Sequence, residues 1–126
     1  MKIDMIECEH QPETFHPKES FCVFVDKNLK QDNGTPKIVG CGNIYWEPIW
    51  DGLLELKIED FEAYDGYGAE IINYLMNRDT NIILNSKATV RSKEFWEKMG
   101  ATFINENLEF ILLKEIFITT KYFSEI

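Results

Sequence analysis

The clearest pattern of apolar and polar positions lies in the middle of the chain, between Leu53 and Met76. The first part of this segment is apolar enough to predict a buried strand, and a short loop leads from it to Gly66 and Gly68. Apolar residues then recur at helical spacing at Ile71, Ile72, Leu75 and Met76. We therefore expect a strand, a tight turn that contains both glycines, and a helix that begins at Gly66 and packs on a sheet.

Shorter apolar segments on both sides of this unit predict the remaining strands. They cover Lys2–Glu7, Ser20–Asp26, Lys37–Tyr45, Asn81–Asn85, Thr102–Asn105 and Leu108–Lys114. Asn33-Gly34 predicts a hairpin turn between Asn28 and Pro36. Gly40 and Gly42, inside a predicted strand, indicate a bulge or a close backbone approach.

A second amphipathic helix is predicted at Ser92–Met99, where Gly100 ends it. The segment Cys8–Glu19 contains two prolines and little periodicity, so we expect a loop there. The C-terminal residues 115–126 are still apolar and must pack on this domain or on a partner chain.

Composition and charge narrow the possible functions. The 126 residues are 44% hydrophobic, which predicts one globular domain, residues 1–126. The net charge of −9 argues against nucleic acid as a partner, because phosphate contacts need a basic surface. It suits a cationic acceptor such as an amine, although solubility alone would also explain it.

The cysteines and histidines point away from disulfides and metals. Three cysteines without a Cys-x-x-Cys motif predict reduced thiols and a cytoplasmic location. Only two histidines are present, so we expect no metal site. Asp4 and Glu7 stand where a signal peptide would be apolar, and no apolar run is long enough to span a membrane.

The two glycines before the central helix suggest phosphate binding. A missing Cβ lets a ligand approach the backbone, and the first turn of a helix offers free N–H groups at the positive end of its dipole. Neither a third glycine nor a Gly-Lys-Ser/Thr ending follows, so the segment is not a dinucleotide fingerprint or a P-loop. A Gly-x-Gly pair alone is also compatible with an ordinary loop.

Two motifs together resemble the GNAT superfamily of acetyl-CoA-dependent N-acetyltransferases. Residues 63–68, Ala-Tyr-Asp-Gly-Tyr-Gly, occupy the place of the family's Arg/Gln-x-x-Gly-x-Gly/Ala loop, and Ile58 stands where an apolar residue precedes it. Residues 95–101, Phe-Trp-Glu-Lys-Met-Gly-Ala, are similar to a later helix of the family. The resemblance covers about residues 36–114. It implies an α/β (α+β) fold, with a central, mostly antiparallel mixed sheet flanked by helices and parallel where it splits.

The chain departs from the family pattern in ways that bear on activity. Ala63 replaces the Arg/Gln, and Asp65 brings a negative charge where a basic residue is usual. Trp96 replaces the tyrosine that serves many members as general acid, and an indole cannot take that role. The region before Ser20 is also too short for the two helices that help to form the family's acceptor pocket.

The resemblance implies where acetyl-CoA, as cosubstrate, would bind. Its pantetheine arm would lie along the backbone of the central strand at Lys57 and Ile58, and its diphosphate on the loop after Ala63. The cofactor-binding residues of that loop would be Ala63, Gly66, Tyr67, Gly68 and Ala69. The basic side chains of Lys87, Arg91 and Lys93 could reach the outer phosphate or simply be solvated.

Three carboxylates are candidates for the general base. Glu55, Glu59 and Asp51 lie on or beside the central strand, and alternation places Glu55 and Glu59 on the face opposite Leu56 and Ile58. A bulge would break that alternation, so the sequence does not choose among them.

We predict acetyl-CoA-dependent N-acetyl transfer to a primary amine, of a small molecule or a peptide, by direct attack. The alternative is a catalytically degenerate domain of the same fold that acts as a binding or assembly module. The shortened N-terminal region and the apolar C-terminal residues further predict a homodimer.

Overall fold

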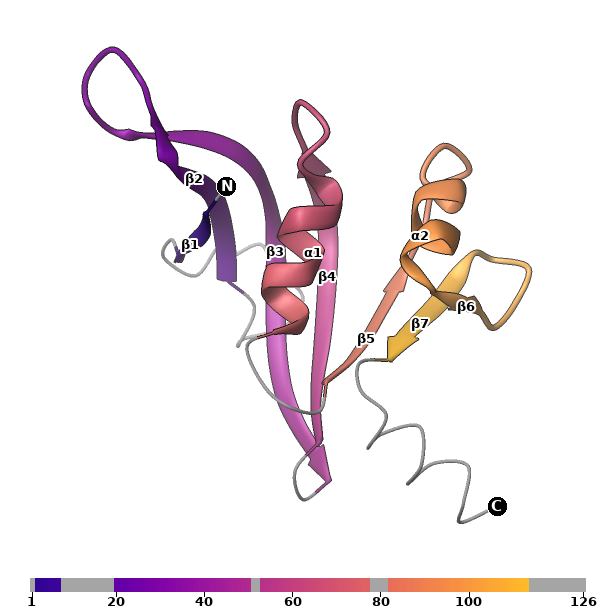
Figure 1. The fold of residues 1–126 in the computed structure, drawn as a ribbon. Coiled ribbons are helices and arrows are strands. Elements are labelled where there is room, and N and C mark those ends of the chain that lie inside the picture. Colours follow the sequence, from indigo (N-terminus) through magenta and orange to yellow (C-terminus); the bar gives the residue numbers. More distant parts are fainter. Residues whose placement is uncertain (1, 8–19, 51–52, 78–81, 114–126) are drawn as a thin grey trace. The chain divides into compact units, whose positions relative to one another are not determined.

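The computed structural model describes residues 2–7, 20–50, 53–77 and 82–113 (Figure 1). The chain forms two compact units, residues 1–45 with 59–77 and residues 46–58 with 78–126. The prediction of a single domain stays a prediction. The strands and helices are β1 (Ile3–Glu7), β2 (Ser20–Lys30), β3 (Pro36–Trp50), β4 (Leu53–Ala63), α1 (Gly68–Met76), β5 (Ile82–Lys87), α2 (Lys93–Met99), β6 (Thr102–Phe103) and β7 (Glu109–Leu113).

The described strands form one mixed sheet in the order β1-β2-β3-β4-β5-β7-β6. β4 and β5 are parallel, whereas β1–β2, β2–β3, β5–β7 and β6–β7 are antiparallel. The parallel ladder ends at Lys57 opposite Asn85, although β4 continues to Ala63. A mostly antiparallel sheet with one parallel pair that parts is the arrangement predicted from the sequence.

In the first unit, the hairpin of β2 and β3 is longer than predicted. The sequence predicted a turn from Asn28, but β2 continues to Lys30, because Lys30 pairs with Pro36 across the hairpin. The turn is confined to residues 31–35, and Gly34 takes its left-handed position at φ 85°. The bulge predicted near Gly40 is present, since the register shifts between Phe24 and Val25.

Helix α1 buries its apolar face in this unit, as its spacing predicts. Ile71, Ile72 and Leu75 have no exposed surface. The helix packs closely against β3 at Gly40, because that residue has no side chain. A Cβ added there would lie 2.6 Å from Ile71 Cδ1 and 2.7 Å from the Glu62 carbonyl oxygen. The helix begins at Gly68, two residues later than predicted.

In the second unit, α2 and the hairpin β6–β7 share an aromatic cluster. The Trp96 ring lies 4.5 Å from the Phe110 ring and 5.0 Å from the Phe95 ring, centroid to centroid. Gly100 ends α2 in the left-handed conformation, at φ 99°. The second helix and its glycine stop are therefore confirmed.

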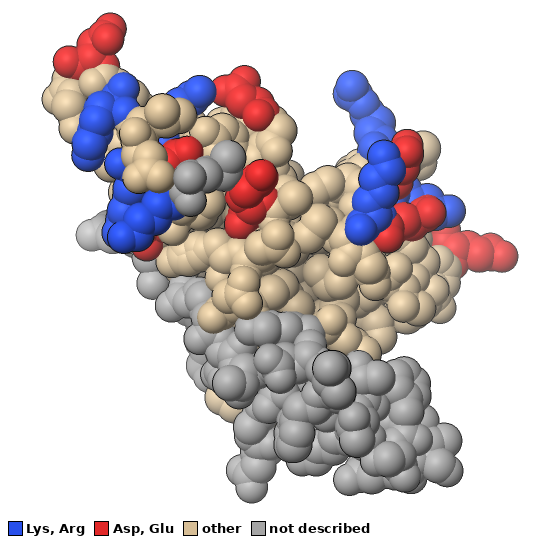
Figure 2. All heavy atoms as spheres, in the orientation of Figure 1, with Lys and Arg blue, Asp and Glu red and all other residues tan. Residues whose placement is uncertain are grey.

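Two predicted segments lie outside the described residues: the loop at 8–19 and the C-terminal residues 115–126. Cys22 and Cys41, the two cysteines within the described part, are free thiols. Figure 2 shows acidic and basic side chains close together on both units. None of the described helices is long and apolar enough to cross a membrane.

Candidate functional site

The turn between β4 and α1 has two consecutive residues with left-handed backbone, Asp65 at φ 51° and Gly66 at φ 80°. Tyr64 N–H donates to the Val39 carbonyl at 2.9 Å, and Tyr67 N–H donates to the Tyr64 carbonyl at 3.0 Å. A Cβ on Gly66 would meet no atom within 4 Å, so its glycine serves the backbone conformation rather than close packing. These bonds fix the turn next to β3.

The start of α1 offers backbone donors. Tyr67 precedes the helix without a side-chain capping bond, and its own N–H is taken within the turn. Among the described residues, no acceptor faces the N–H groups of Gly66, Gly68, Ala69 or Glu70. The sequence predicted Gly66, Gly68 and Ala69 as donors, and it also predicted Tyr67, whose N–H group is used within the turn. Glu70 adds a donor that the motif did not indicate. Such groups, at the positive end of a helix, suit an anion.

The side chain of Tyr67 anchors this turn to β2. Tyr67 is 8% exposed, and its hydroxyl donates to Asp26 Oδ2 at 2.9 Å. Asp26, 2% exposed, also accepts the N–H groups of Asn28 at 2.9 Å and Lys2 at 3.4 Å. The Asn28 N–H bond is the main cause that lowers the pKa of Asp26, and the bond to Asp26 raises the pKa of Tyr67. The sequence offered Tyr67 only as a backbone donor.

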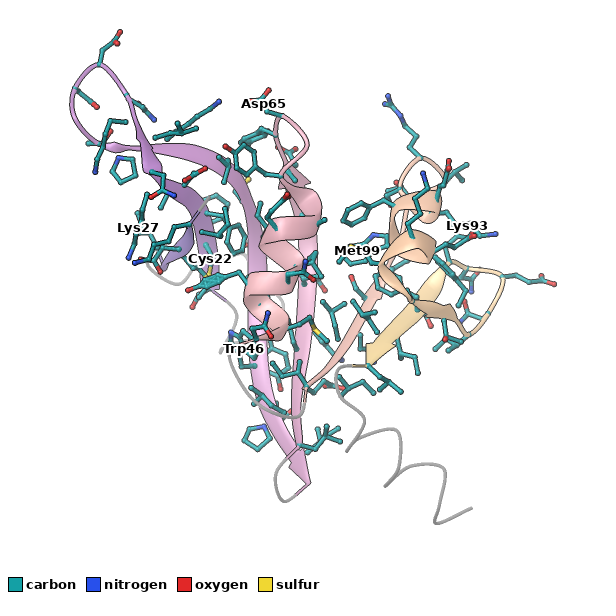
Figure 3. The ribbon with its side chains drawn as sticks, viewed as in Figure 1. Cys22, Lys27, Trp46, Asp65, Lys93 and Met99 are labelled. Atoms are coloured by element: carbon teal, nitrogen blue, oxygen red, sulfur yellow. The ribbon has the colours of Figure 1, made fainter. Side chains whose placement is uncertain are left out.

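Asp65 does not stand alone as an unpaired negative charge at the turn. Figure 3 shows the place of Asp65 at the turn. Lys37, on β3, places its Nζ 3.1 Å from Asp65 Oδ2, and the two side chains are 40% and 66% exposed. Ala63, where the family has Arg or Gln, is the exposed last residue of β4. The structure therefore supplies a basic side chain to this turn from a strand that the motif does not include.

Tyr64, at the end of β4, belongs to a small polar cluster with Cys41 and Glu62. Its hydroxyl lies 3.5 Å from Cys41 Sγ and 3.3 Å from Glu62 Oε2. The contact with Cys41 and the nearby carboxylate raise the pKa of Tyr64 to about 12, so the phenol stays protonated at neutral pH. Nothing in the sequence pattern indicated this cluster.

The backbone of Lys57 and Ile58 borders β5. Lys57 lies opposite Asn85 at the end of the parallel ladder. One residue further, the Ser86 hydroxyl donates to the Ile58 carbonyl oxygen at 2.6 Å. A carbonyl oxygen has two lone pairs, so the Ile58 group can accept a second donor, but it is already partly satisfied by the protein.

Asp60, within β4, has a left-handed backbone at φ 53°. Its carboxylate lies 3.5 Å from Asn43 Nδ2, on β3. One left-handed residue within a strand is typical of a bulge. Because Asp60 follows Glu59, the alternation before it is intact, with Leu56 and Ile58 buried and Lys57 and Glu59 exposed.

The candidate bases are not brought together. Glu55 is half-buried, with its Oε1 4.0 Å from Lys57 Nζ, and Glu59 is exposed. Asp51 lies outside the described residues. Whether one of them acts as a base stays a prediction.

Trp96 is a core residue, 4% exposed, rather than a group directed at solvent. Of the three basic residues proposed for an outer phosphate, Lys93 pairs with Glu97 at 3.8 Å, within α2, and lies 5.7 Å from the Phe103 ring centroid. Lys87 and Arg91 are exposed. α2 thus offers aromatic packing where the family tyrosine would stand.

The order of the described strands, the parallel pair of β4 and β5 and the glycine turn before α1 agree with the expected GNAT-like α/β fold. No protein-family model and no curated protein matches the sequence. Solved structures do match, and the three named below are 10–19% identical to this chain.

The spermidine/spermine N-acetyltransferase SpeG from Vibrio cholerae is 11% identical, with 94% of this chain and 98% of that chain covered and a TM-score of 0.52. A protein from Exiguobacterium sp. 255-15, provisionally named an acetyltransferase, is 10% identical, with 95% and 99% covered and a TM-score of 0.52. Glucosamine-6-phosphate N-acetyltransferase from Arabidopsis thaliana is 19% identical over 70% of this chain, with a TM-score of 0.47, and the chain spans 63% of its length. The chain therefore shares the fold of GNAT acetyltransferases, and the predicted resemblance is confirmed at that level.

Proposed function

We propose that this protein is an acetyl-CoA-dependent N-acetyltransferase that acts on an amine by direct attack. The observation that carries the proposal is the turn before α1. It combines two left-handed residues, Asp65 and Gly66, with backbone N–H groups that have no acceptor among the described residues. This arrangement suits a diphosphate, and it occurs on a fold that SpeG, a named spermidine/spermine N-acetyltransferase, also has.

The residues fit the diphosphate because backbone donors do not depend on side-chain identity. Gly66, Gly68 and Ala69 bind it through their N–H groups, and the Tyr67–Asp26 bond keeps these groups aligned. Lys57 and Ile58 would hold the pantetheine arm, because the Ile58 carbonyl accepts one bond from Ser86 and could accept a second donor. Acetyl-CoA supplies a thioester carbonyl that reacts with a neutral amine.

Glu55 or Glu59 accepts the proton that a cationic amine must lose before it attacks. Trp96 donates no proton, because an indole N–H is too weak an acid and the ring is buried. The leaving sulfur therefore departs as a thiolate. The acceptor is an amine, and the net charge of −9 favours a cationic one, including polyamines and lysine-containing peptides.

Binding and turnover are tested separately. A ligand at about 100 times its Kd adds about 2.7 kcal/mol of stability, so acetyl-CoA at that concentration raises Tm by several degrees. Free thiol released in the presence of polyamines, small primary amines or lysine peptides then reports acetyl transfer. Absence of any shift and of any bound acetyl-CoA by calorimetry would remove the proposal.

A second candidate is a domain of this fold that has lost catalysis and acts as a binding or assembly module. Two features favour it: Trp96 fills the core where a general acid is common, and Ala63 lacks the motif's basic group. This candidate predicts no thiol release with any amine. Turnover with one acceptor of the screen would contradict it.

A further inference from the structure

Lys37 forms an ion pair with a residue of the turn before α1. It comes from the start of β3, and its Nζ lies 3.1 Å from Asp65 Oδ2. The two side chains are 40% and 66% exposed, so the pair is held in water rather than in the core. Exposed ion pairs contribute little to stability, and the ammonium group can therefore exchange its partner for another anion at small cost.

The other charges at this turn are negative. Asp65 lies within it, and Glu70 is in the first turn of α1. The Oε2 atom of Glu70 is buried and has no hydrogen-bond donor among the described residues. Lys37 offsets the charge of Asp65, which would otherwise repel an anion from the backbone donors of Gly66, Gly68 and Ala69.

We propose that Lys37 is the side chain that binds the diphosphate of acetyl-CoA, in place of the basic residue that is absent at Ala63. This role of Lys37 rests on the proposed function, the binding of acetyl-CoA at the turn. Asp65 keeps the ammonium group beside the turn in the free protein, and the incoming diphosphate takes over that ion pair. A lysine suits this exchange because its compact ammonium group has three donors and no fixed plane to align.

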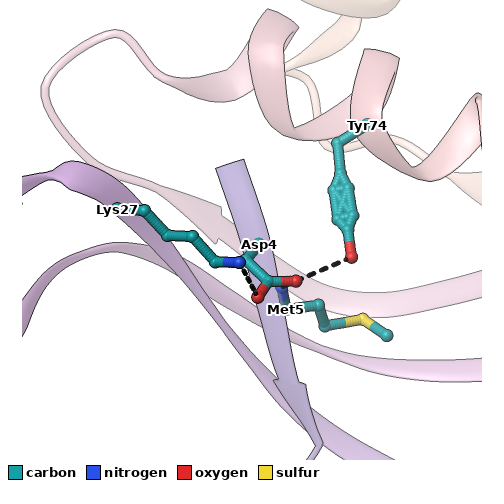
Figure 4. A network of polar contacts seen from close by, with 4 residues as sticks. All are labelled: Asp4, Met5, Lys27 and Tyr74. Carbon is teal, nitrogen blue, oxygen red and sulfur yellow. Dashed lines mark hydrogen bonds and ion pairs between the residues drawn. The ribbon is translucent and has the colours of Figure 1, made fainter. Parts of the chain in front are cut away.

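Lys27 provides a closely matched control. Its Nζ lies 2.9 Å from Asp4 Oδ2, with side-chain exposures of 43% and 39%, so it is also a half-exposed lysine paired with an aspartate in the same unit. The partner there is held by β1 and by the Tyr74 hydroxyl, which donates to Asp4 Oδ1 at 3.2 Å (Figure 4). Lys27→Gln removes the same charge from the protein as Lys37→Gln, but away from the glycine turn.

Calorimetric titration of acetyl-CoA into the full chain tests the proposal, in about 50 mM and about 300 mM salt. Lys37→Gln is expected to raise Kd about tenfold at the lower salt concentration and less at the higher one, because salt screens the lost attraction. Lys37→Arg keeps the charge and should stay within about threefold of wild type, and Lys27→Gln within about twofold. Melting curves confirm that each variant is folded.

The outcomes separate this inference from the proposed function. Wild-type protein that does not bind acetyl-CoA refutes both. Wild-type protein that binds, together with a Lys37→Gln variant that binds equally well, refutes only the role of Lys37. Equal weakening by Lys37→Gln and Lys27→Gln, or by Lys37→Gln and Lys37→Arg, also refutes it, because a local positive charge would then not be the cause.

Discussion

Asp26 shows how one carboxylate can tie three separate segments together. Lys2, Asn28 and Tyr67 each donate one hydrogen bond to it. The pKa of Asp26 is lowered, so the folded protein binds a proton there less readily than the unfolded chain. Its contribution to stability is therefore present above the unfolded pKa, near 4, and is lost as the pH falls through the lower folded value.

We predict that replacing Asp26 with asparagine makes Tm depend less on pH in the acidic range. Asp26→Asn should be less stable than wild type at pH 6, and the difference in Tm should shrink by about half or more by pH 2. Thermal melts at a series of pH values measure this. Asp32→Asn, in the exposed hairpin turn, serves as control and should follow wild type throughout. A difference in Tm between Asp26→Asn and wild type that is the same at every pH would contradict the lowered pKa of Asp26.

At the scale of elements, the contact between α1 and β3 depends on the absence of a side chain at Gly40. One obstacle to a Cβ there is the Glu62 carbonyl oxygen at 2.7 Å, which belongs to the backbone of β4 and cannot rotate away. The other is Ile71 Cδ1 at 2.6 Å, in the fully buried face of α1. An added methyl group would therefore push apart two strands and a helix.

Gly40→Ala is expected to lower the free energy of unfolding by about 1–3 kcal/mol, as overpacking of a tight core does. Gly34→Ala is the matched comparison, because its Cβ would meet nothing within 4 Å and only its φ of 85° is unfavourable. It should cost about 1 kcal/mol. Urea unfolding of both variants measures the two values. Equal losses, or a smaller loss for Gly40→Ala, would show that the close approach is relieved without strain.

The elements themselves could be predicted because their signals are local. The spacing of apolar residues predicted the buried face of α1, and Gly100 predicted the end of α2. Asn33-Gly34 predicted the turn of the hairpin. The length of β2 could not be predicted, because its exposed residues 27–30 extend the strand beyond the apolar part of the segment.

Of the candidate site, only the backbone turn could be predicted from the sequence, and the side chains that contact it could not. Gly66 and Gly68 located the turn, but its two side-chain partners are distant in the sequence. Tyr67 and Asp26 are 41 residues apart, and their bond depends on which strand lies under the helix. Lys37 likewise reaches Asp65 through the sheet, because it lies on β3, the strand next to β4, although the two residues are far apart in the sequence. No local pattern contains that information.

At the scale of the whole molecule, the edge of the described sheet at β1 is the feature that bears on assembly. β1 is the terminal strand of the described sheet, and Ile6 on it is 51% exposed. A strand edge with apolar side chains is a surface on which another chain can pair. The sequence adds apolar residues at 115–126, outside the described part.

We predict that the protein self-associates at concentrations of tens of micromolar. Sedimentation velocity should show a dimer for the full chain and a shift toward monomer after deletion of residues 116–126. Replacing Ile6 with lysine should have a similar effect if the strand edge contributes, because a charge on an edge strand opposes pairing. A monomer in all three samples would contradict the prediction.

The left-handed backbone at Asp60 restricts which amino acids can replace this residue during evolution. Asparagine and glycine accept that conformation best, and both are a single transition away from an aspartate codon. Saturation of position 60 with all amino acids, followed by selection for folded protein and sequencing, should retain these three and deplete valine and isoleucine. All three residues are rare in strands. A secondary-structure prediction from residue propensities would therefore place a loop inside β4 in any variant that keeps one of them at position 60, although the strand would still be present.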